Sequence, residues 1–423
     1  MKDLFIDQKQ ERDRLVNGEY IPRETLKERL KTMDNDLIKV IIGPRRAGKS
    51  VFAIQLLSNK NFAYLNFDDE RLLSIKDYDI ILKGIREVYG ETRYILFDEI
   101  QNLERWELFV NRLQRKNYRL ILTGSNSRLL SRELSTHLTG RYLEYPVYPF
   151  SFREYLTARG VEYEKDSLTK EQQGDILREL NLYITSGGYP EVVVKHLESR
   201  DYLTTLFDSV LFKDVIRRYN VRYPSKLHDL ALFLISVSAN PFTHSNLKNT
   251  LGFGSVHTVQ EYVEYLKESF VIMPVKRLSH KTKEILKSPE KVYAYDTGMS
   301  IALKPNLTRN YGSLIENVVA VELLRKNKKI YYFRAKNGAE VDFVICSNGE
   351  LTELLQVCYD PSSPGTERRE IRGFKYALQE LRYFRSKLGL SIITWDYEGE
   401  KNFNNNRIRY IPLWHWLLGL VKS

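Results

Sequence analysis

The segment GPRRAGKS at residues 43–50 constrains this chain more than any other stretch. It follows the apolar run 37–42 and leads into SVFAIQLLSN, so we expect a buried strand before it and a helix after it. The spacing GxxxxGK[ST] lets the backbone curl so that successive N–H groups face phosphate oxygens beside the positive end of a helix. The sequence therefore predicts a phosphate-binding loop.

Two residues of the loop have separate expected roles. Lys49 is expected to reach the β- and γ-phosphates, and the Ser50 hydroxyl to ligate Mg²⁺. ATP and Mg²⁺ are therefore the expected cofactors. The predicted nucleotide-binding residues are Gly43, Pro44, Arg45, Arg46, Ala47, Gly48, Lys49 and Ser50.

A buried strand is also expected at YILF, directly before an acidic pair. Phosphoryl transfer uses one carboxylate to hold Mg²⁺ and a second polar group to orient the attacking water. We assign the first role to Asp98, as a metal ligand with Ser50, and the second to Glu99. A strand that simply ends in two surface acids is the alternative interpretation.

Two further catalytic candidates follow. The predicted strand 119–123 ends at GSNS, where Asn126 could position the attacking water or could be an ordinary turn residue. Among Arg128, Arg132 and Arg141, we prefer Arg141 to stabilise transition-state charge, donated by its own or a neighbouring subunit. A surface arginine at a strand edge is the alternative for Arg141.

Alternating helix and strand signals over the first part of the chain predict a mostly parallel sheet with helices on both faces. Such a sheet binds nucleotide at the carboxyl ends of its strands. Most of the candidate residues follow predicted strands directly.

Several longer segments resemble one known family. GPRRAGKS, YILFDEIQNLERWELFVNRL, LILTGSNSRLLSRELSTHLTGRY and YPFSFREYL look like the AAA-type P-loop ATPases of bacteria and archaea whose C-terminal half is a domain of unknown function. YITSGGYPEVV, YAYDTGMS and GSLIENVVAVELL extend the resemblance over nearly the whole chain. It implies Asp98 and Glu99 as the acidic pair, Asn126 as a sensor and Arg141 as the matching arginine.

The expected fold is α/β in four parts. An AAA-like P-loop core covers 1–150, and the resemblance implies a helical lid or linker at 151–225. Three helices and two strands at 226–300 match a winged helix. Its third helix carries acids that would repel DNA, whereas the predicted wing is rich in lysine, so DNA contact and a structural or protein-binding role both stay open.

The part at 301–423 is similar to restriction-endonuclease-like folds. Glu316 lies on a predicted helix, and Asp342 lies on a strand within AEVDFVI. Where those nucleases carry a Glu-x-Lys pair, this chain has Gln356 and Cys358, which leaves a poor metal site. We expect a nuclease-shaped but inactive domain.

The charge and cysteine content set limits on partners and location. The net charge of +11 is spread along the chain, which permits DNA binding without requiring it. Two cysteines cannot build a disulfide framework, and no signal peptide or apolar stretch of about 20 residues is present, so we expect a cytoplasmic protein without a membrane partner.

The predicted function is Mg²⁺-dependent ATP hydrolysis by an AAA-type homo-oligomer that couples its ATP or ADP state to a DNA or protein partner. The alternative is a DNA-binding regulator or DNA-processing factor that uses ATP as a switch. A protein-remodelling or signalling ATPase is a third class.

Overall fold

The computed structural model describes residues 2–126, 140–164, 168–279, 281–304, 310–347, 349–381, 388–403 and 406–420. Arg128, Arg132 and His280 lie outside these ranges. The chain forms two compact units, the first made of residues 1–150 with 268–270 and the second of 151–267 with 271–423. Among the described helices, none combines the length and apolarity needed to cross a bilayer.

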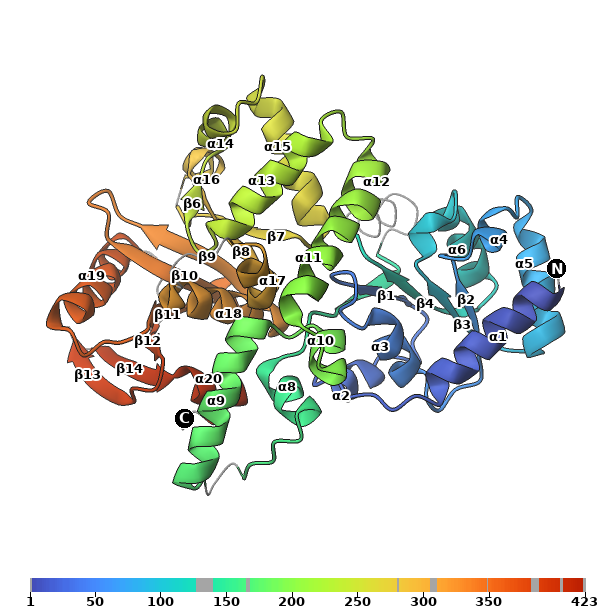
Figure 1. Ribbon diagram of the computed structural model, residues 1–423, viewed down its shortest axis with the longest axis horizontal. Helices are drawn as coiled ribbons and strands as arrows, with labels where there is room; N and C mark the ends of the chain where they lie inside the picture. The colour runs from blue at the N-terminus through green and yellow to red at the C-terminus, as the bar shows by residue number, and fades with distance from the viewer. Residues whose placement is uncertain are drawn as a thin grey trace. The chain divides into compact units, whose positions relative to one another are not determined.

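The first unit contains a parallel five-stranded sheet (Figure 1). The strand order is β2-β3-β4-β1-β5, so β4 lies between β1 and β3. The strands are β1 (Ile38–Ile42), β2 (Phe62–Asn66), β3 (Tyr94–Asp98), β4 (Arg119–Gly124) and β5 (Tyr142–Pro146). The helices are α1 (Lys2–Val16), α2 (Leu26–Leu30), α3 (Lys49–Leu56), α4 (Glu70–Leu73), α5 (Tyr78–Tyr89) and α6 (Trp106–Arg115).

The central strands are apolar because both of their faces are covered by helices. On β3, Leu96 shares a core with Phe52 of α3. The next residue, Phe97, points to the other face and stacks on Phe109 of α6, with ring centroids 5.7 Å apart. The predicted parallel α/β core is confirmed.

The second unit begins with helices and contains a clasp between two sequence motifs. SGGYP begins at the last residue of α9, and Asp296 of YDTG precedes α17. The carboxylate of Asp296 accepts hydrogen bonds from the backbone N–H of Gly188 at 2.7 Å and of Met299 at 3.1 Å. A Cβ at Gly187 would lie 2.1 Å from this carboxylate, so the motif requires glycine there. The helices of this region are α8 (Phe152–Ala158), α9 (Lys170–Ser186), α10 (Pro190–Lys195), α11 (Ser199–Val210), α12 (Arg217–Tyr219) and α17 (Thr297–Ala302).

This clasp packs 151–225 with the later part of the chain, since α9 and α11 both contact α17 within the second unit. The division of the chain into four parts stays a prediction.

Three helices and three short strands follow in the second unit. The helices are α13 (Pro224–Ser236), α14 (His244–Thr250) and α15 (Val256–Glu268). Thr243 caps α14 by accepting a hydrogen bond from the N–H of Asn246 at 3.1 Å. The strands β6 (Pro241–Phe242), β7 (Ile272–Val275) and β8 (Glu290–Ala294) pair antiparallel in the order β6-β8-β7, and α16 (Thr282–Lys287) lies between β7 and β8.

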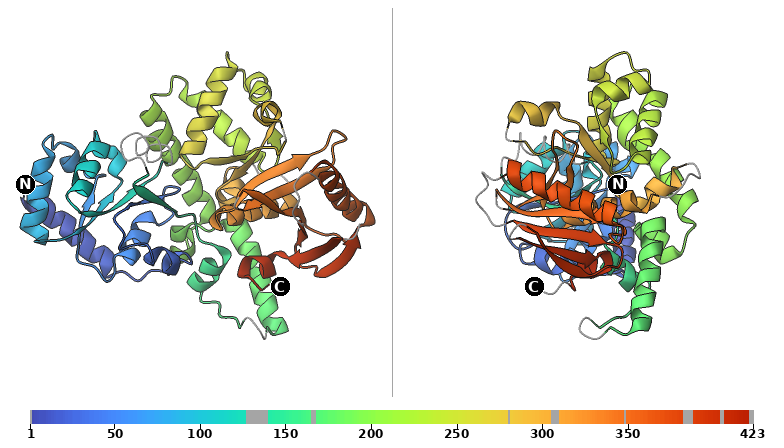
Figure 2. Two further views of the ribbon diagram at one scale, coloured as in Figure 1. Left: turned by 180° about the vertical axis from the view of Figure 1, so that it is seen from behind. Right: turned by 90° about the vertical axis from the view of Figure 1, so that its left-hand side faces the viewer.

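The last part of the second unit is a mixed six-stranded sheet of order β13-β14-β12-β11-β10-β9 (Figure 2). Phe374 and Ala377 of α19 share a core with Val344 and Leu354 of the sheet, so α19 covers one face. The elements are α18 (Tyr311–Arg325), β9 (Lys329–Arg334), β10 (Glu340–Ser347), β11 (Glu350–Cys358), α19 (Pro364–Glu380), β12 (Gly389–Thr394), β13 (Gly399–Phe403), β14 (Asn406–Pro412) and α20 (Leu413–Leu418).

Candidate nucleotide site

The loop GPRRAGKS runs from the end of β1 to the start of α3. Gly43 has φ 152°, and a Cβ there would lie 1.9 Å from the carbonyl oxygen of Val147, so only glycine fits. Gly48, directly before α3, has φ 92° and is in the left-handed region that glycine adopts without strain. The glycines therefore set the tight curl that the sequence predicted.

A hydroxyl and a carboxylate meet at the start of α3. The Ser50 Oγ donates a hydrogen bond to Asp98 Oδ1 at 3.0 Å, and the Tyr64 hydroxyl donates to Asp98 Oδ2 at 3.2 Å. Burial, followed by the nearby charge of Glu99, raises the pKa of Asp98 to about 6. Oxygen atoms of this kind are the ligands that Mg²⁺ prefers, so the donor set fits the metal.

Lys49 and Glu99 lie near each other at the same edge of the sheet. The Lys49 Nζ donates to the carbonyl oxygen of Pro44 at 3.1 Å and lies 3.8 Å from Glu99 Oε1. Glu99 has φ 49°, and its N–H donates to the Thr123 hydroxyl at 3.0 Å, which turns the chain sharply after β3. The side chain of Glu99 also accepts a hydrogen bond from the amide of Gln101.

Asn126 is buried just beyond β4, the strand between β1 and β3, so it lies at the carboxyl edge of the sheet. Arg141 lies at the opposite edge. Its carbonyl accepts a hydrogen bond from the N–H of Ile38, where β1 begins, whereas the loop follows the end of β1. The structure thus brings Lys49, Ser50, Asp98, Glu99 and Asn126 to one edge and separates Arg141 from the loop of its own subunit.

Sequence reasoning missed three side chains that support the site. The buried guanidinium of Arg23 donates hydrogen bonds to the carbonyl oxygen of Ala47, at 3.2 Å, and to that of Tyr148. These bonds stabilise the conformation of the loop. Thr123 donates to Asp98, as Tyr64 does. A strand ending in threonine before GSNS was a signal for Thr123, but nothing near Arg23 in the sequence marks it.

A second cluster of charged residues lies in the second unit. Lys291 of β8 is buried, and its ammonium contacts Glu316 of α18 at 2.8 Å and both Glu340 and Asp342 of β10 at 2.6 and 3.0 Å. Burial opposes its charge, but the surrounding anionic groups raise the pKa of Lys291 well above its ordinary value. Burial and the neighbouring Asp342 also raise the pKa of Glu316. Within the described ranges, no group of three or more acidic, His or Cys side chains is arranged to hold a metal ion.

The two residues that replace the Glu-x-Lys pair have structural contacts. Gln356 accepts a hydrogen bond from the N–H of Asp342 at 2.7 Å and donates to the carboxylate of Glu370 at 2.7 Å and the carbonyl of Glu340 at 3.0 Å. Cys358 is buried in the core under α19, which raises the pKa of its thiol to about 11.

Three family models match consecutive parts of the chain. An AAA domain matches residues 35–156, and two domains of unknown function, DUF8612 and DUF4143, match residues 177–310 and 311–416. The AAA match contains the five residues that the structure brings to one edge of the sheet.

Similar proteins cover nearly the full length. The uncharacterized protein MJ1544 of Methanocaldococcus jannaschii is 33% identical over 400 residues, which span 90% of this chain and 88% of the relative. An uncharacterized protein of Haemophilus influenzae is 29% identical over 412 residues, 93% of this chain and 98% of the relative. Among solved structures, the Walker-type ATPase of Pyrococcus abyssi is 18% identical with a TM-score of 0.46, covering 68% of this chain and 99% of that one.

The sheet order, the loop with its acidic partners and the full-length likeness to an archaeal relative lead to one conclusion: the chain belongs to the prokaryotic AAA-type P-loop ATPases that carry a C-terminal DUF4143 domain.

Proposed function

We propose that the protein binds ATP with Mg²⁺ and hydrolyses it at the edge formed by β1, β3 and β4. The observation that carries this proposal is the 3.0 Å hydrogen bond between Ser50 and Asp98, with Lys49 and Glu99 beside it. Ser50 and Asp98 would hold the metal, which supplies positive charge for the phosphate oxygens. Lys49 would bind the phosphates.

The remaining proposed roles concern the attacking water. Glu99, once Lys49 turns from it toward phosphate, would accept a proton from that water, and Asn126 would orient it. The left-handed backbone of Glu99 supports this role because strained backbone of this kind clusters at catalytic sites.

Turnover and nucleotide binding should separate in two variants. We expect Lys49→Ala to lose ATP binding, and Glu99→Gln to bind ATP while hydrolysis falls by about 10²- to 10⁴-fold. Glu104→Gln is the matched control, since its carboxylate is 74% exposed and should leave turnover unchanged. Full hydrolysis by Glu99→Gln would reject the role assigned to Glu99.

We propose a homo-oligomer in which Arg141 acts on the site of a neighbouring subunit. Its exposed position at the edge away from its own loop supports action between subunits rather than within one. Neither Arg141→Ala nor Lys49→Ala should hydrolyse ATP alone, but mixed subunits should regain activity because each supplies what the other lacks. No recovery on mixing, together with a monomeric mass in ATP, would contradict this proposal.

For the second unit, we propose a winged helix at 226–300 and a nuclease-like but inactive domain after it. The order α13, β6, α14, α15, β7, β8 supports the first assignment. The ammonium of Lys291 supports inactivity: its three N–H donors match three carboxylates, so none remains for water or phosphate. DNA cleavage in Mg²⁺ that is lost on Asp342→Ala would overturn this assignment.

A further inference from the structure

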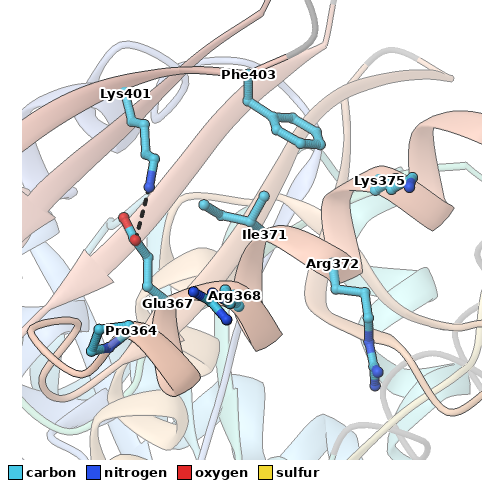
Figure 3. Close-up of a pocket in the computed structure, with 8 residues that line it drawn as sticks. All are labelled: Pro364, Glu367, Arg368, Ile371, Arg372, Lys375, Lys401 and Phe403. Carbon is cyan, nitrogen blue, oxygen red and sulfur yellow. Dashed lines mark hydrogen bonds and ion pairs between the residues drawn. The ribbon is translucent and has the colours of Figure 1, made fainter.

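A basic groove lies between α19 and β13 in the second unit. Its volume is about 420 Å³, within the range of ligand-binding clefts. Figure 3 shows the side chains that line it: Pro364, Glu367, Arg368, Ile371, Arg372, Lys375, Lys401 and Phe403.

The single carboxylate in the groove is already neutralised. Glu367 accepts hydrogen bonds from Lys401 Nζ at 2.8 Å and from the Tyr410 hydroxyl at 2.7 Å. The bond from Lys401, followed by that from Tyr410, lowers the pKa of Glu367, so it stays ionised and paired. This pair leaves the groove with the charge of the remaining cations.

Those cations are Arg368, Arg372 and Lys375, which are all exposed. None of the three has an ion pair with any residue in the described part of the chain, whereas the neighbouring Arg369 contacts Glu370 at 2.7 Å. An ion pair of an exposed cation contributes little to stability. Three neighbouring cations that lack ion pairs nevertheless create a local positive potential.

The spacing of these cations suits a repeating anion. Positions 368, 372 and 375 lie on one face of α19 and span about 10 Å along the helix axis. One strand of a nucleic-acid duplex advances about 3.4 Å per phosphate, so this row is long enough for about three phosphates. Guanidinium groups bind phosphate oxygens in pairs, which favours arginine at two of the three positions.

The groove also has an apolar part. Ile371 and Phe403 are half-buried, and in Figure 3 they lie between Lys401 on one side and Arg372 and Lys375 on the other. An aromatic ring beside a cationic row is the combination that single-stranded nucleic-acid sites use to stack a base. An acidic peptide would use the cations but gain little from the ring.

We propose that the groove between α19 and β13 binds the sugar–phosphate backbone of a nucleic-acid strand. The proposal goes beyond the proposed ATP hydrolysis and does not depend on it. This contact differs from the lysine-rich segment between β7 and β8, the part of the predicted winged helix that the sequence left open for DNA.

The test is fluorescence anisotropy of labelled single-stranded and duplex DNA with the full-length protein over a salt series. Each phosphate contact contributes about 0.7 to 0.9 to the slope of log affinity against log salt. The triple variant Arg368→Gln, Arg372→Gln, Lys375→Gln should therefore lower the slope by about 2 to 3 and weaken binding. Its melting temperature should be unchanged because all three side chains are exposed.

A second triple variant provides the matched control. Lys281→Gln, Lys283→Gln, Lys287→Gln removes the same charge from three exposed lysines of the segment between β7 and β8, and should leave the slope unchanged. A loss of slope in this variant and not in the groove variant would overturn the proposal, as would equal displacement of DNA by polyglutamate of matched charge. Repeating the titration in Lys49→Ala separates the two proposals, since DNA binding should persist there even without nucleotide binding.

Discussion

Replacing Lys291 by methionine removes the one cation that joins β8, β10 and α18. The methionine keeps about the length of the side chain but leaves Glu316, Glu340 and Asp342 without the ammonium that they share, while Glu340 keeps Arg334 at 3.8 Å. Lys291 is only 3% exposed, and the side chains of Glu316 and Asp342 are 13% and 14% exposed, so water can compensate little. Removing one member of a buried ion cluster costs about 3 to 5 kcal/mol.

The assay is thermal unfolding of the full-length protein. For a unit of this size, about 1 kcal/mol corresponds to about 2 to 4 °C, so the melting transition of the second unit should fall by about 6 to 20 °C. Lys267→Met is the control, because Lys267 is 49% exposed and its pair with Glu264 at 3.0 Å should contribute about 1 kcal/mol or less.

A metal titration sharpens the same prediction. In Lys291→Met the carboxylates lose the ammonium that they share, and a divalent cation that draws them together in its place should stabilise the variant by about 2.7 kcal/mol when the metal is at about 100 times its dissociation constant. The wild-type second unit should show no such gain from Mn²⁺. The stabilising role of Lys291 is refuted if Lys291→Met and the wild type have the same melting temperature, or if Mn²⁺ stabilises the second unit of both proteins equally.

Three further predictions concern the clasp and the loop. Burial raises the pKa of Asp296 from 3.8 to about 6, so its protonated form stabilises the folded state below about pH 4. This stabilisation is lost as the pH rises through 6 and amounts to about 3 kcal/mol, at 1.36 kcal/mol per pKa unit. Urea unfolding should therefore show that the unfolding free energy of wild type, relative to that of Asp296→Asn, changes by about 3 kcal/mol between pH 4 and 7. If the unfolding free energies of the two proteins change equally with pH, this prediction is contradicted. Gly43→Ala should destabilise the first unit by about 1 to 3 kcal/mol and impair nucleotide binding, since its Cβ meets the Val147 carbonyl, whereas Gly174→Ala meets nothing within 4 Å and should be tolerated. Arg23→Gln should weaken binding of a fluorescent ATP analogue while Lys27→Gln, on an exposed site, should not; equal affinities would remove Arg23 from the support of the loop.

The sequence by itself determined which candidate residues meet at one edge of the first sheet. A phosphate loop depends on glycines at fixed spacing, and a buried strand depends on a run of apolar residues. Both are local patterns that can be identified in the sequence. Parallel strands align their carboxyl ends, so the residues after β1, β3 and β4 had to share one edge once the sheet was predicted. Lys49, Asp98 and Asn126 were therefore accessible without coordinates.

Only the tertiary structure decided what completes or blocks each site. Arg23 reaches Ala47 from outside every motif, and Arg141 falls at the far edge because β5 runs parallel to β1. The ammonium of Lys291 contacts the acidic side chains of α18 and β10, although its own strand β8 belongs to a different sheet. No local sequence pattern encodes this contact between residues far apart in the chain. Spacing along the chain determines which residues share a helix or strand, but long-range packing determines which charged side chains contact one another.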